Sequence, residues 1–390
     1  MKRKSSGTYQ TDTTSGEPVR AFVPAPLPPD PLPTLDGQRG RLHDKAMLAC
    51  GRLDAVSALL PDPDLFLYAY VRREALLSSQ IEGTQSSLSD LLLFEIRETP
   101  GVPFDDVVEV SNYIDALDHG LARMANGFPL SNRLLREMHA RLLARGRGAD
   151  KQPGKFRTTQ NWLGGTRPGN AAFVPPPPNR IQDCMADLER FIHAQTPSCS
   201  PLVKAALAHV QFETIHPFLD GNGRIGRLLI ALILHAERVL SQPLLYLSLF
   251  FKQHRAEYYR LLDRCRAEGD WEAWLDFFLE GVAETAAGAV DTANRLRAMF
   301  ETDAGEIRAL GRAAPNALRI FDEFRNRPLA SIKDLARRAD VAFPTASRAV
   351  NALQRLGIVE EVTGRQRDRV YAYRKYIEIL NEGAEPLHNR

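Results

Sequence analysis

The sequence predicts a mainly α-helical protein of two or three domains with one small β element. Apolar residues recur at helical spacing through most of the chain from residue 41 onward. Residues 150–180 are instead dense in glycine, proline and threonine, a composition that favours turns and short strands. The chain has 390 residues, whereas one domain usually contains roughly 100–200.

The first 40 residues are rich in serine, threonine and glycine and then in proline, with seven prolines from Pro18 to Pro33. Proline fixes φ and removes a backbone donor, so we expect a disordered Pro-rich arm over residues 1–40. We interpret this arm as a linker or tail. A docking segment for a proline-reading domain is the alternative.

Helical spacing predicts the body of the protein. We expect an amino-terminal helical region at 41–104, a core at 105–288 and a linker helix at 289–312. Residues 150–180 interrupt the core with β-forming pieces at 161–163 and 172–174, and form either a hairpin that acts as a flap or a long surface loop. The helices of the core are expected at 105–124, 131–145, 181–194, 202–215, 225–239, 246–266 and 271–287.

The carboxyl-terminal segment 313–380 has its own pattern, and 381–390 is expected to be a tail. Ser331 can cap a helix, Pro344 can open the next helix and Gly357 can end it. The expected order of elements resembles the winged helix-turn-helix fold of DNA-binding proteins. Its helices are expected at 317–324, 333–339 and 345–356, and its two strands at 358–362 and 370–373.

The net charge of +2 is distributed unevenly. Residues 312–375 contain 14 Lys and Arg against 7 Asp and Glu, so this segment carries +7 and the remainder carries −5. A basic segment favours a polyanion partner, although basic surfaces also occur without one. If this segment binds DNA, the side chains placed to contact phosphates or bases are Arg337, Arg338, Ser347, Arg348, Arg365, Arg367 and Arg369.

Cysteine usage and hydropathy indicate a cytoplasmic protein. The cysteines at 50, 184, 199 and 265 show neither CxxC pairs nor zinc spacing, which favours a reducing compartment. The longest apolar run, 228–234, is far shorter than the ~20 residues of a membrane-spanning helix, and no apolar core follows the charged amino terminus. We therefore expect no membrane association.

Residues 216–227, His-Pro-Phe-Leu-Asp-Gly-Asn-Gly-Arg-Ile-Gly-Arg, lie between two apolar helices. Gly221 and Gly223 let backbone amides face outward, because no Cβ covers them. The helix that begins near Ile225 presents its free amides and the positive end of its dipole to the same place. This segment therefore predicts an anion-binding loop.

The side chains of this loop suit a nucleotide. Arg224 and Arg227 offer paired donors for phosphate oxygens, and Asn222 adds amide donors. Asp220 offers a hard oxygen ligand for Mg²⁺ on a polyphosphate. His216 is the candidate general base, because the usual pKa of histidine lies near neutrality. Singly each residue has a simpler structural explanation, but together within twelve positions they indicate a site.

The segment HPFLDGNGRIGR resembles the signature HPFxDGNGRxxR of Fic-domain proteins, with every defined position matched. Fic enzymes transfer AMP from ATP to a Tyr, Thr or Ser hydroxyl of a protein and release pyrophosphate. The resemblance implies a Fic-fold helical bundle with a β-hairpin flap, ATP as substrate and Mg²⁺ as cofactor. Gly223 favours adenylyl transfer, since relatives that phosphorylate their targets resemble HxFxxANKR, with Lys at that place.

The resemblance also implies a role for each residue of the loop. His216 would deprotonate the target hydroxyl, Asp220 would hold Mg²⁺ and Arg227 would hold the γ-phosphate. Positioning and charge stabilisation of this kind are what phosphoryl-type transfer requires. The α- and β-phosphates would lie against Gly221, Asn222, Gly223 and Arg224, and the ATP-binding segment would continue through Ile225 and Gly226.

Two further segments resemble parts of the same family. Residues 154–178, which begin GKFR and end FVPPPP, resemble the flap that pairs with the target's modified segment. Leu163 and Gly164 would line the nucleotide site there. Tyr258 resembles an adenine-side contact, and Arg266 stands where some relatives have an asparagine.

Upstream, residues 78–83, Ser-Ser-Gln-Ile-Glu-Gly, match the pattern (S/T)xxxE(G/N) of the Fic inhibitory helix. Ser78 and Glu82 lie four residues apart and so share a helix face, and Gly83 permits close packing or the end of a helix. The resemblance implies that Glu82 blocks Arg227, so that ATP binds in a non-productive pose. The chain resembles the class with an amino-terminal inhibitory helix. An ordinary solvated Glu82 is the alternative.

Other functions stay open. A nucleotide-sensing, DNA-binding transcriptional regulator would use the Fic-like part only as a sensor, and winged helices also serve as protein-docking or dimerisation units. A Fic enzyme could also take another nucleotide or a phosphocholine carrier as its donor. We expect self-modification. The target protein is not readable from the sequence. The oligomeric state is open as well, a homodimer included, since some relatives form dimers.

Overall fold

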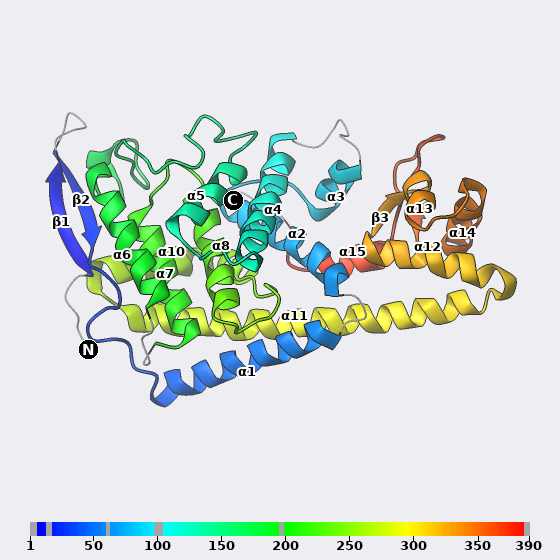
Figure 1. Cartoon of the computed structure of the whole chain (residues 1–390), viewed down its shortest axis with the longest axis horizontal. Coiled ribbons are helices and arrows are strands. Elements are labelled where there is room, and N and C mark those ends of the chain that lie inside the picture. The colour runs from blue at the N-terminus through cyan, green and yellow to red at the C-terminus, as the bar shows by residue number, and fades with distance from the viewer. Residues whose placement is uncertain (1–5, 13–17, 60–62, 97–103, 195–198, 386–390) are drawn as a thin grey trace. The chain divides into compact units, whose positions relative to one another are not determined.

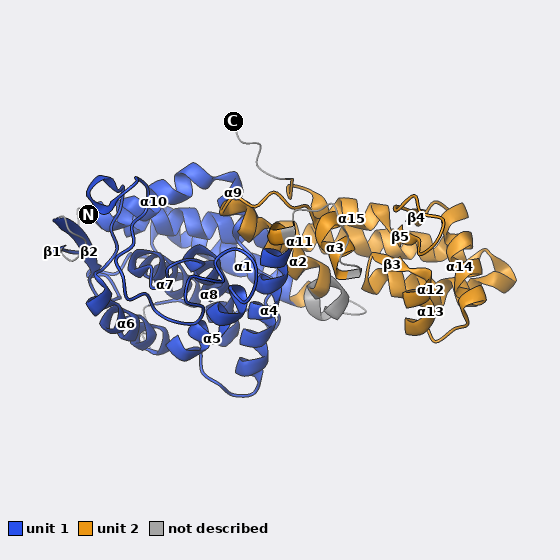
Figure 2. Cartoon of the chain, turned by 90° about the horizontal axis from the view of Figure 1, so that it is seen from above, with its two compact units in different colours: residues 1–54, 108–287 blue, residues 55–107, 288–390 orange. Residues whose placement is uncertain are grey.

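The computed structural model describes residues 6–12, 18–59, 63–96, 104–194 and 199–385, and these residues are mainly helical (Figure 1). They divide into two compact units, which Figure 2 shows in different colours. The first unit contains residues 1–54 and 108–287, and the second contains residues 55–107 and 288–390. Among the described residues, no helix combines the length and the apolarity needed to cross a bilayer.

The first unit is built around two helices, α7 (Pro201–Ile215) and α8 (Asn222–Ala236), which pack against each other. Ser200 caps α7 and Pro201 opens it, and the residues from Leu202 to Ile215 are all buried. The loop 216–221 joins the two helices. Around them lie α5 (Asn132–Leu142), α6 (Ile181–His193), α9 (Ser248–Gln253), α10 (Arg255–Glu268) and parts of α1 (Gly37–Leu59), α4 (Phe104–Ala125) and α11 (Trp271–Arg308).

The amino-terminal segment differs from the disordered Pro-rich arm expected over residues 1–40. Strands β1 (Gly7–Asp12) and β2 (Val19–Pro24) form an antiparallel hairpin. Val19 and Ala21 are buried with Val174, because β2 presents apolar side chains between Pro18 and the closely spaced prolines that start at Pro24. The prolines concealed this short strand pattern. Residues 1–5 and 13–17 lie outside the described part of the chain.

Two helix boundaries differ from those expected. The predicted helices at 271–287 and 289–312 are a single helix, α11, because its alanine-rich middle tolerates Gly288, which costs about 1 kcal/mol relative to alanine. The predicted helix at 246–266 is instead divided at His254 into α9 and α10.

The second unit contains the winged helix-turn-helix that the sequence predicts. Ser331 caps α13 by accepting a hydrogen bond of 3.2 Å from the amide of Asp334, and Gly357 follows α14 with φ +70°. The helices are α12 (Ala314–Asn326), α13 (Ile332–Arg338), α14 (Phe343–Arg355) and α15 (Arg374–Asn381). Strands β3 (Leu329–Ser331), β4 (Glu360–Glu361) and β5 (Val370–Ala372) form an antiparallel sheet in the order β3-β5-β4.

Helices α2 (Pro63–Ile81) and α3 (Leu88–Ile96) belong to this second unit, whereas the sequence analysis placed them in a region of their own before the core. Within the unit, α2 packs against α12 and α15, and α3 packs against β3 and α15. The helix that leads into the inhibitory pattern, α2, therefore packs directly against helices of the winged-helix domain.

Candidate active site

His216 lies where α7 ends and the loop begins. Its amide donates to the carbonyl of Phe212 at 2.9 Å, and its backbone is left-handed, with φ 49° and ψ 61°. This conformation is uncommon for a residue other than glycine, and here it forms the C-cap that ends α7. The half-buried imidazole is thus placed at the mouth of the loop, as the sequence predicts.

Asn222 closes the loop. Its Oδ1 accepts a hydrogen bond of 2.9 Å from the amide of Phe218, and its Nδ2 donates to the carbonyl of Phe218, also at 2.9 Å. The side chain is buried, so its polar atoms are used in folding the loop. The side chain of Asn222 therefore stabilises the loop. Its backbone amide, at the start of α8, is the group that lies at the candidate anion site.

The start of α8 has the geometry of an anion site. Gly221 precedes the helix with φ +77°, and Ile225 makes the first intrahelical hydrogen bond, to the carbonyl of Gly221 at 3.1 Å. The amides of Asn222, Gly223 and Arg224 come before that bond, at the positive end of the helix dipole. Such a helix terminus binds phosphate oxygens.

Arg224 is held by a buried carboxylate. Its Nη1 lies 3.1 Å from Oε2 of Glu109 on α4, and both side chains are almost completely buried. Arg147 approaches the same carboxylate from the other side, with Nε 3.6 Å from Oε1. Arg227 is also buried on α8. Glu109 could not be recognised as a partner of Arg224 from the sequence, because 115 residues separate the two.

Asp220 is the predicted Mg²⁺ ligand, and its Oδ1 also lies 3.6 Å from Nη2 of Arg224. Its side chain is 31% exposed, and Oδ1 accepts a hydrogen bond of 2.6 Å from the amide of Gly221. No group of three or more His, Cys, Asp or Glu in the described ranges is arranged to hold a metal. Mg²⁺ in nucleotide sites is usually held by one or two carboxylates together with phosphates and waters, so one carboxylate at the phosphate site fits.

His139 is a site residue that the sequence analysis missed. Its Nδ1 accepts from the amide of Gly154 at 2.8 Å, so Nε2 donates to the carbonyl of Asp220 at 3.0 Å. Its ring stacks on Phe218, with 3.7 Å between ring centroids. Burial lowers the pKa of His139 to about 4, which keeps the ring neutral at neutral pH. One buried ring therefore joins α5, the loop and the base of the flap.

Arg157 is a second residue that the sequence analysis missed. Its Nε donates to the carbonyl of His216 at 2.9 Å, and its Nη2 donates to the carbonyl of Pro176 at 2.5 Å. Its own amide donates to the carbonyl of Pro217 at 2.9 Å. Burial lowers its pKa to about 10, so the guanidinium remains charged at neutral pH. Arg157 thus joins the two ends of the flap to the candidate base.

The flap is a short hairpin with one β-bridge, between Leu163 and Phe173. The Leu163 amide donates to the Phe173 carbonyl at 2.8 Å, and Gly164 turns the chain with φ +67°. Nδ2 of Asn161 donates to the carbonyl of Phe218 at 3.2 Å, which ties the flap to the loop. The predicted hairpin at 150–180 therefore forms, and Leu163 and Gly164 lie at its turn.

Strand β2 adds to the flap. The amide of Phe22 donates to the carbonyl of Val174 at 2.9 Å, and the rings of Phe22 and Phe173 lie 6.1 Å apart. The guanidinium of Arg266 lies 4.1 Å from the centroid of the Phe173 ring. The flap is thus supported by the amino-terminal hairpin and by α10.

Tyr258 lies in the core of the first unit. It is 1% exposed, and its hydroxyl lies 2.9 Å from Nε2 of His209, whose Nδ1 lies 2.9 Å from the carbonyl of Gly226. Burial lowers the pKa of His209 to about 3, so the ring is neutral, and it links α10 to α8. The predicted contact of Tyr258 with adenine stays a prediction.

The residues of the inhibitory pattern lie at the end of α2. Ser78 is buried on the helix, and Glu82 lies in the turn that follows Ile81, with its amide 3.0 Å from the carbonyl of Ser79. Gly83 has φ +105°, which glycine adopts readily. Glu82 belongs to the second unit and Arg227 to the first, so their pairing stays a prediction.

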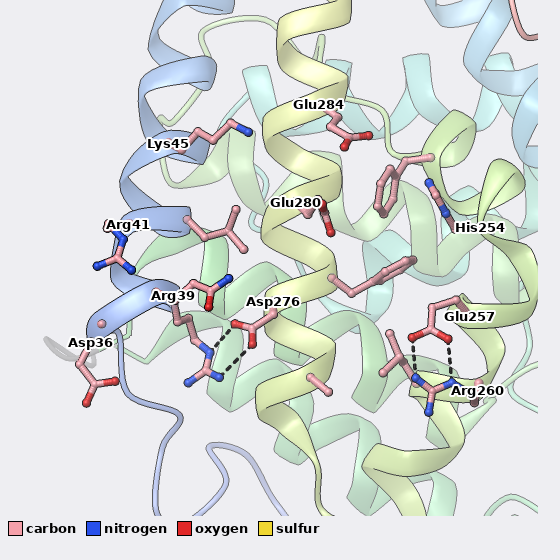
Figure 3. A pocket seen from close by; sticks show the side chains of 17 residues that line it. Asp36, Arg39, Arg41, Lys45, His254, Glu257, Arg260, Asp276, Glu280 and Glu284 are labelled. Carbon is pink, nitrogen blue, oxygen red and sulfur yellow. Dashed lines mark hydrogen bonds and ion pairs between the residues drawn. The ribbon is translucent and has the colours of Figure 1, made fainter.

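A separate cavity of about 970 Å³ lies among α1, α9, α10 and α11 (Figure 3). Charged pairs line it: Arg39 Nε is 2.6 Å from Asp276 Oδ1, and Arg260 Nε is 2.7 Å from Glu257 Oε2. The residues that line it include none of the loop 216–227 or the flap. It is distinct from the candidate active site.

Family models match three parts of the chain. Residues 41–122 match the Fic/DOC family N-terminal model, residues 129–234 match the Fic/DOC family model and residues 313–363 match the IclR helix-turn-helix domain. The loop and the flap both fall within the second match, and the helix with the inhibitory pattern falls within the first.

Curated relatives and solved structures agree with these matches. The chain is 31% identical over 208 residues to protein adenylyltransferase Fic of Drosophila grimshawi, and 30% identical to that of Drosophila ananassae. Each match covers 53% of this chain, and 40% and 39% of those relatives, so the chain matches only about two fifths of their length.

Two solved structures share the fold. A Fic family protein from Desulfovibrio desulfuricans G20 aligns with TM-score 0.55 and 23% identity over 86% of this chain and 95% of that one. Fic-1 from C. elegans aligns with TM-score 0.51 and 23% identity over 67% and 74%. The chain therefore contains a Fic/DOC family domain preceded by the N-terminal region of that family, and its carboxyl-terminal unit contains a winged helix-turn-helix domain.

Proposed function

We propose that this protein is an adenylyltransferase that moves AMP from ATP to Tyr, Thr or Ser hydroxyls of target proteins and of itself. The observation that supports this most is the loop 216–227, where a left-handed His216 stands at the mouth of a loop that ends on the amides of α8. The relatives named protein adenylyltransferase support the same reaction. The chemistry needs a base, an anion site and a phosphate clamp, and the candidate residues supply all three.

In this proposal His216 takes the proton of the target hydroxyl. The hydroxyl oxygen then attacks the α-phosphorus of ATP, the bond from that phosphorus to the bridging oxygen breaks, and pyrophosphate leaves with the electron pair. The result is a phosphodiester between AMP and the target side chain. Arg157 supports the step indirectly, because it holds the carbonyl of His216 and so orients the imidazole.

The phosphates bind at the start of α8 in the proposed complex. The amides of Asn222, Gly223 and Arg224 donate to the α- and β-phosphates, and Arg227 holds the γ-phosphate. Asp220 holds Mg²⁺, which neutralises charge on the polyphosphate when it is bound. The flap around Leu163 and Gly164 covers the nucleotide and aligns the target's segment by β pairing.

We further propose that Glu82 inhibits the enzyme by occupying Arg227. The pattern at 78–83 supports this, as does the turn geometry, in which α2 ends at Ile81 and Gly83, with φ +105°, follows Glu82 in the turn. When Glu82 occupies Arg227, the guanidinium no longer holds the γ-phosphate. The α-phosphorus of ATP is then not positioned for attack by the target hydroxyl.

Labelling with ATP carrying label on the α-phosphate tests the proposal. The Glu82→Gly variant should incorporate more label than the parent, and the His216→Ala variant should incorporate none while still binding nucleotide. Label that persists without His216 would remove the proposed base. Label from the γ-phosphate instead would show phosphoryl transfer, and competition by another nucleotide or a phosphocholine carrier would identify a different donor.

A DNA-binding function of the winged helix is a second candidate. Arg348 on α14 and Arg365, Arg367 and Arg369 in the wing are exposed, which suits contacts with phosphates or bases. Arg338 does not suit this role, because its Nε lies 2.7 Å from Oε2 of Glu323. A mobility-shift series against salt tests this function, since phosphate contacts give a steep loss of affinity.

A further inference from the structure

The second unit, which we name the winged-helix unit, holds the end of α2 just before the turn that carries Glu82. Gln80 lies inside the inhibitory pattern, two residues before Glu82, and its side chain is buried. Its Nε2 donates to the carbonyl of Ala384 at 3.0 Å and to the carbonyl of Ser86 at 3.1 Å. A buried amide that reaches a residue 304 positions away links the pattern to the far end of the chain.

A second contact lies two helical turns earlier on α2. Nη2 of Arg73 donates to the carbonyl of Glu382 at 2.6 Å, and Arg73 is also buried. Because Arg73 and Gln80 are seven residues apart, they lie on the same face of α2. That face therefore meets residues 382–385, which we name the carboxyl-terminal clamp.

The clamp is fixed within the same unit. The carboxylate of Glu382 pairs with Arg295 of α11 through contacts of 2.7 and 2.5 Å. Tyr376, Ile377 and Leu380 of α15, which leads into the clamp, are buried, and α15 packs on α2 and α3. Helix α2 also packs on α12 of the winged helix.

The position of Glu82 depends on the residues that the clamp holds. The amide of Glu82 donates to the carbonyl of Ser79, and the amide of Gly83 donates to the carbonyl of Gln80 at 3.1 Å. The turn that carries Glu82 is therefore built on Ser79 and Gln80. A shift of Gln80 away from Ala384 shifts this turn with it.

We propose that the winged-helix unit is a regulatory domain of the transferase, and that its carboxyl-terminal clamp keeps Glu82 in the inhibitory position. Release of the clamp, by any ligand or modification that repacks α15, frees the turn and raises activity. This inference rests on the proposed function of Glu82 as the inhibitor. The winged helix would thereby control the activity of the transferase domain in the same chain.

Two substitutions in the full-length chain release the clamp from opposite sides. Gln80→Met removes the amide donor at similar length. Gly383→Pro disrupts the clamp itself, because proline cannot adopt the φ of +77° found at Gly383. Gln354→Met is the matched control, since Gln354 is exposed on α14 of the same unit and lies outside the inhibitory pattern and the clamp. Each substitution is made with Glu82 present and again in the Glu82→Gly variant.

Amide hydrogen exchange of residues 82–84 and the rate of self-labelling from ATP are then measured. With Glu82 present, Gln80→Met and Gly383→Pro should each raise both quantities roughly fivefold, about the effect of one lost hydrogen bond, while Gln354→Met changes neither. In the Glu82→Gly variant they should add nothing to the labelling rate.

The two proposals fail differently in this experiment. If Glu82→Gly raises labelling but the two clamp variants leave labelling at the parental rate, the regulatory inference is overturned and the inhibitor stands. Unchanged exchange of residues 82–84 overturns the inference whatever the labelling shows. If Glu82→Gly leaves labelling unchanged, the inhibitory role of Glu82 fails, and the regulatory inference fails with it.

Discussion

The carbonyl of His216 and Nε of Arg157 are joined by a hydrogen bond of 2.9 Å. The candidate base is thus fixed through its main chain by a buried arginine at the base of the flap. The same guanidinium donates to carbonyls at both ends of the flap, those of Thr159 and Pro176. One guanidinium therefore contacts the backbone of both the flap and the candidate base, so a displacement of the flap would also displace His216.

This link predicts the effect of Arg157→Lys. Lysine keeps the charge but cannot make the forked contacts, so at least one buried carbonyl loses its donor. We expect a loss of about 2 kcal/mol in the free energy of unfolding and about a tenfold fall in the labelling rate of the Glu82→Gly enzyme. Denaturation and single-turnover labelling measure the two effects.

Arg136→Lys is the control for that change. Arg136 also contacts the flap, with Nε 2.8 Å from the carbonyl of Gly154, but it is exposed. Its replacement should change stability by less than about 0.5 kcal/mol and leave labelling near the parental rate. Equal losses in the two variants would contradict the special role of Arg157.

The two glycines of the loop should respond differently to alanine. Gly221 has φ +77°, and a Cβ there would lie 3.1 Å from Leu142, so Gly221→Ala should cost about 1–2 kcal/mol of stability. Gly223 lies in the first turn of α8, where alanine is tolerated, so Gly223→Ala should fold normally and bind ATP more weakly. Thermal unfolding and nucleotide titration separate the two.

The stability of the protein should fall on acidification. Burial lowers the folded-state pKa of His139 to about 4 and that of His209 to about 3, whereas unfolded histidine titrates near 6.5. The unfolded chain therefore binds more protons below pH 6.5, and stability present above that pH is lost as pH falls toward the folded pKa values. Each ring should contribute a loss of about 2 kcal/mol between pH 7 and pH 5.

Denaturation at pH 7 and at pH 5 measures this loss, and His139→Gln should reduce it. His193→Gln is the control, because His193 is exposed. An unchanged pH dependence in the His139 variant would show that this ring does not remain neutral in the folded protein.

The basic wing predicts a salt-dependent interaction with DNA. If Arg365 neutralises one phosphate, Arg365→Ala should weaken binding to all sequences and reduce the slope of log affinity against log salt by about 1. Arg297→Ala, an exposed change on α11 outside the winged helix, should leave the slope unchanged. Binding that is weak and identical in both variants would favour a protein-docking winged helix.

The sequence predicted the parts of the site that are contiguous. Residues 216–227 contain the candidate base, the carboxylate, the glycines and the arginines in one continuous segment, and local rules predict a helix start among them. The caps at Ser331 and Gly357 predicted the winged helix for the same reason, since capping depends on near neighbours.

The partners of these residues were not predictable in the same way. Glu109, His139 and Arg157 come from α4, α5 and the flap, and nothing near them in the sequence marks them as neighbours of the loop. The grouping of α2 with the winged helix depends on packing between segments that are distant in the sequence. Hydrophobic periodicity reports only on the local helix or strand, so it does not predict such packing. Asn222 was assigned to phosphate because the sequence does not show that its amide closes the loop on Phe218.

The amino-terminal hairpin bears on how the enzyme is prepared in the laboratory. Recombinant chains are often trimmed to the start of a family match, which here is residue 41. Such trimming would remove Phe22 from Val174 and expose an edge of the flap that β2 covers in the intact chain. A chain shortened in this way would keep every candidate site residue but lose part of the support of the flap, so an activity measured on it would understate that of the 390-residue chain.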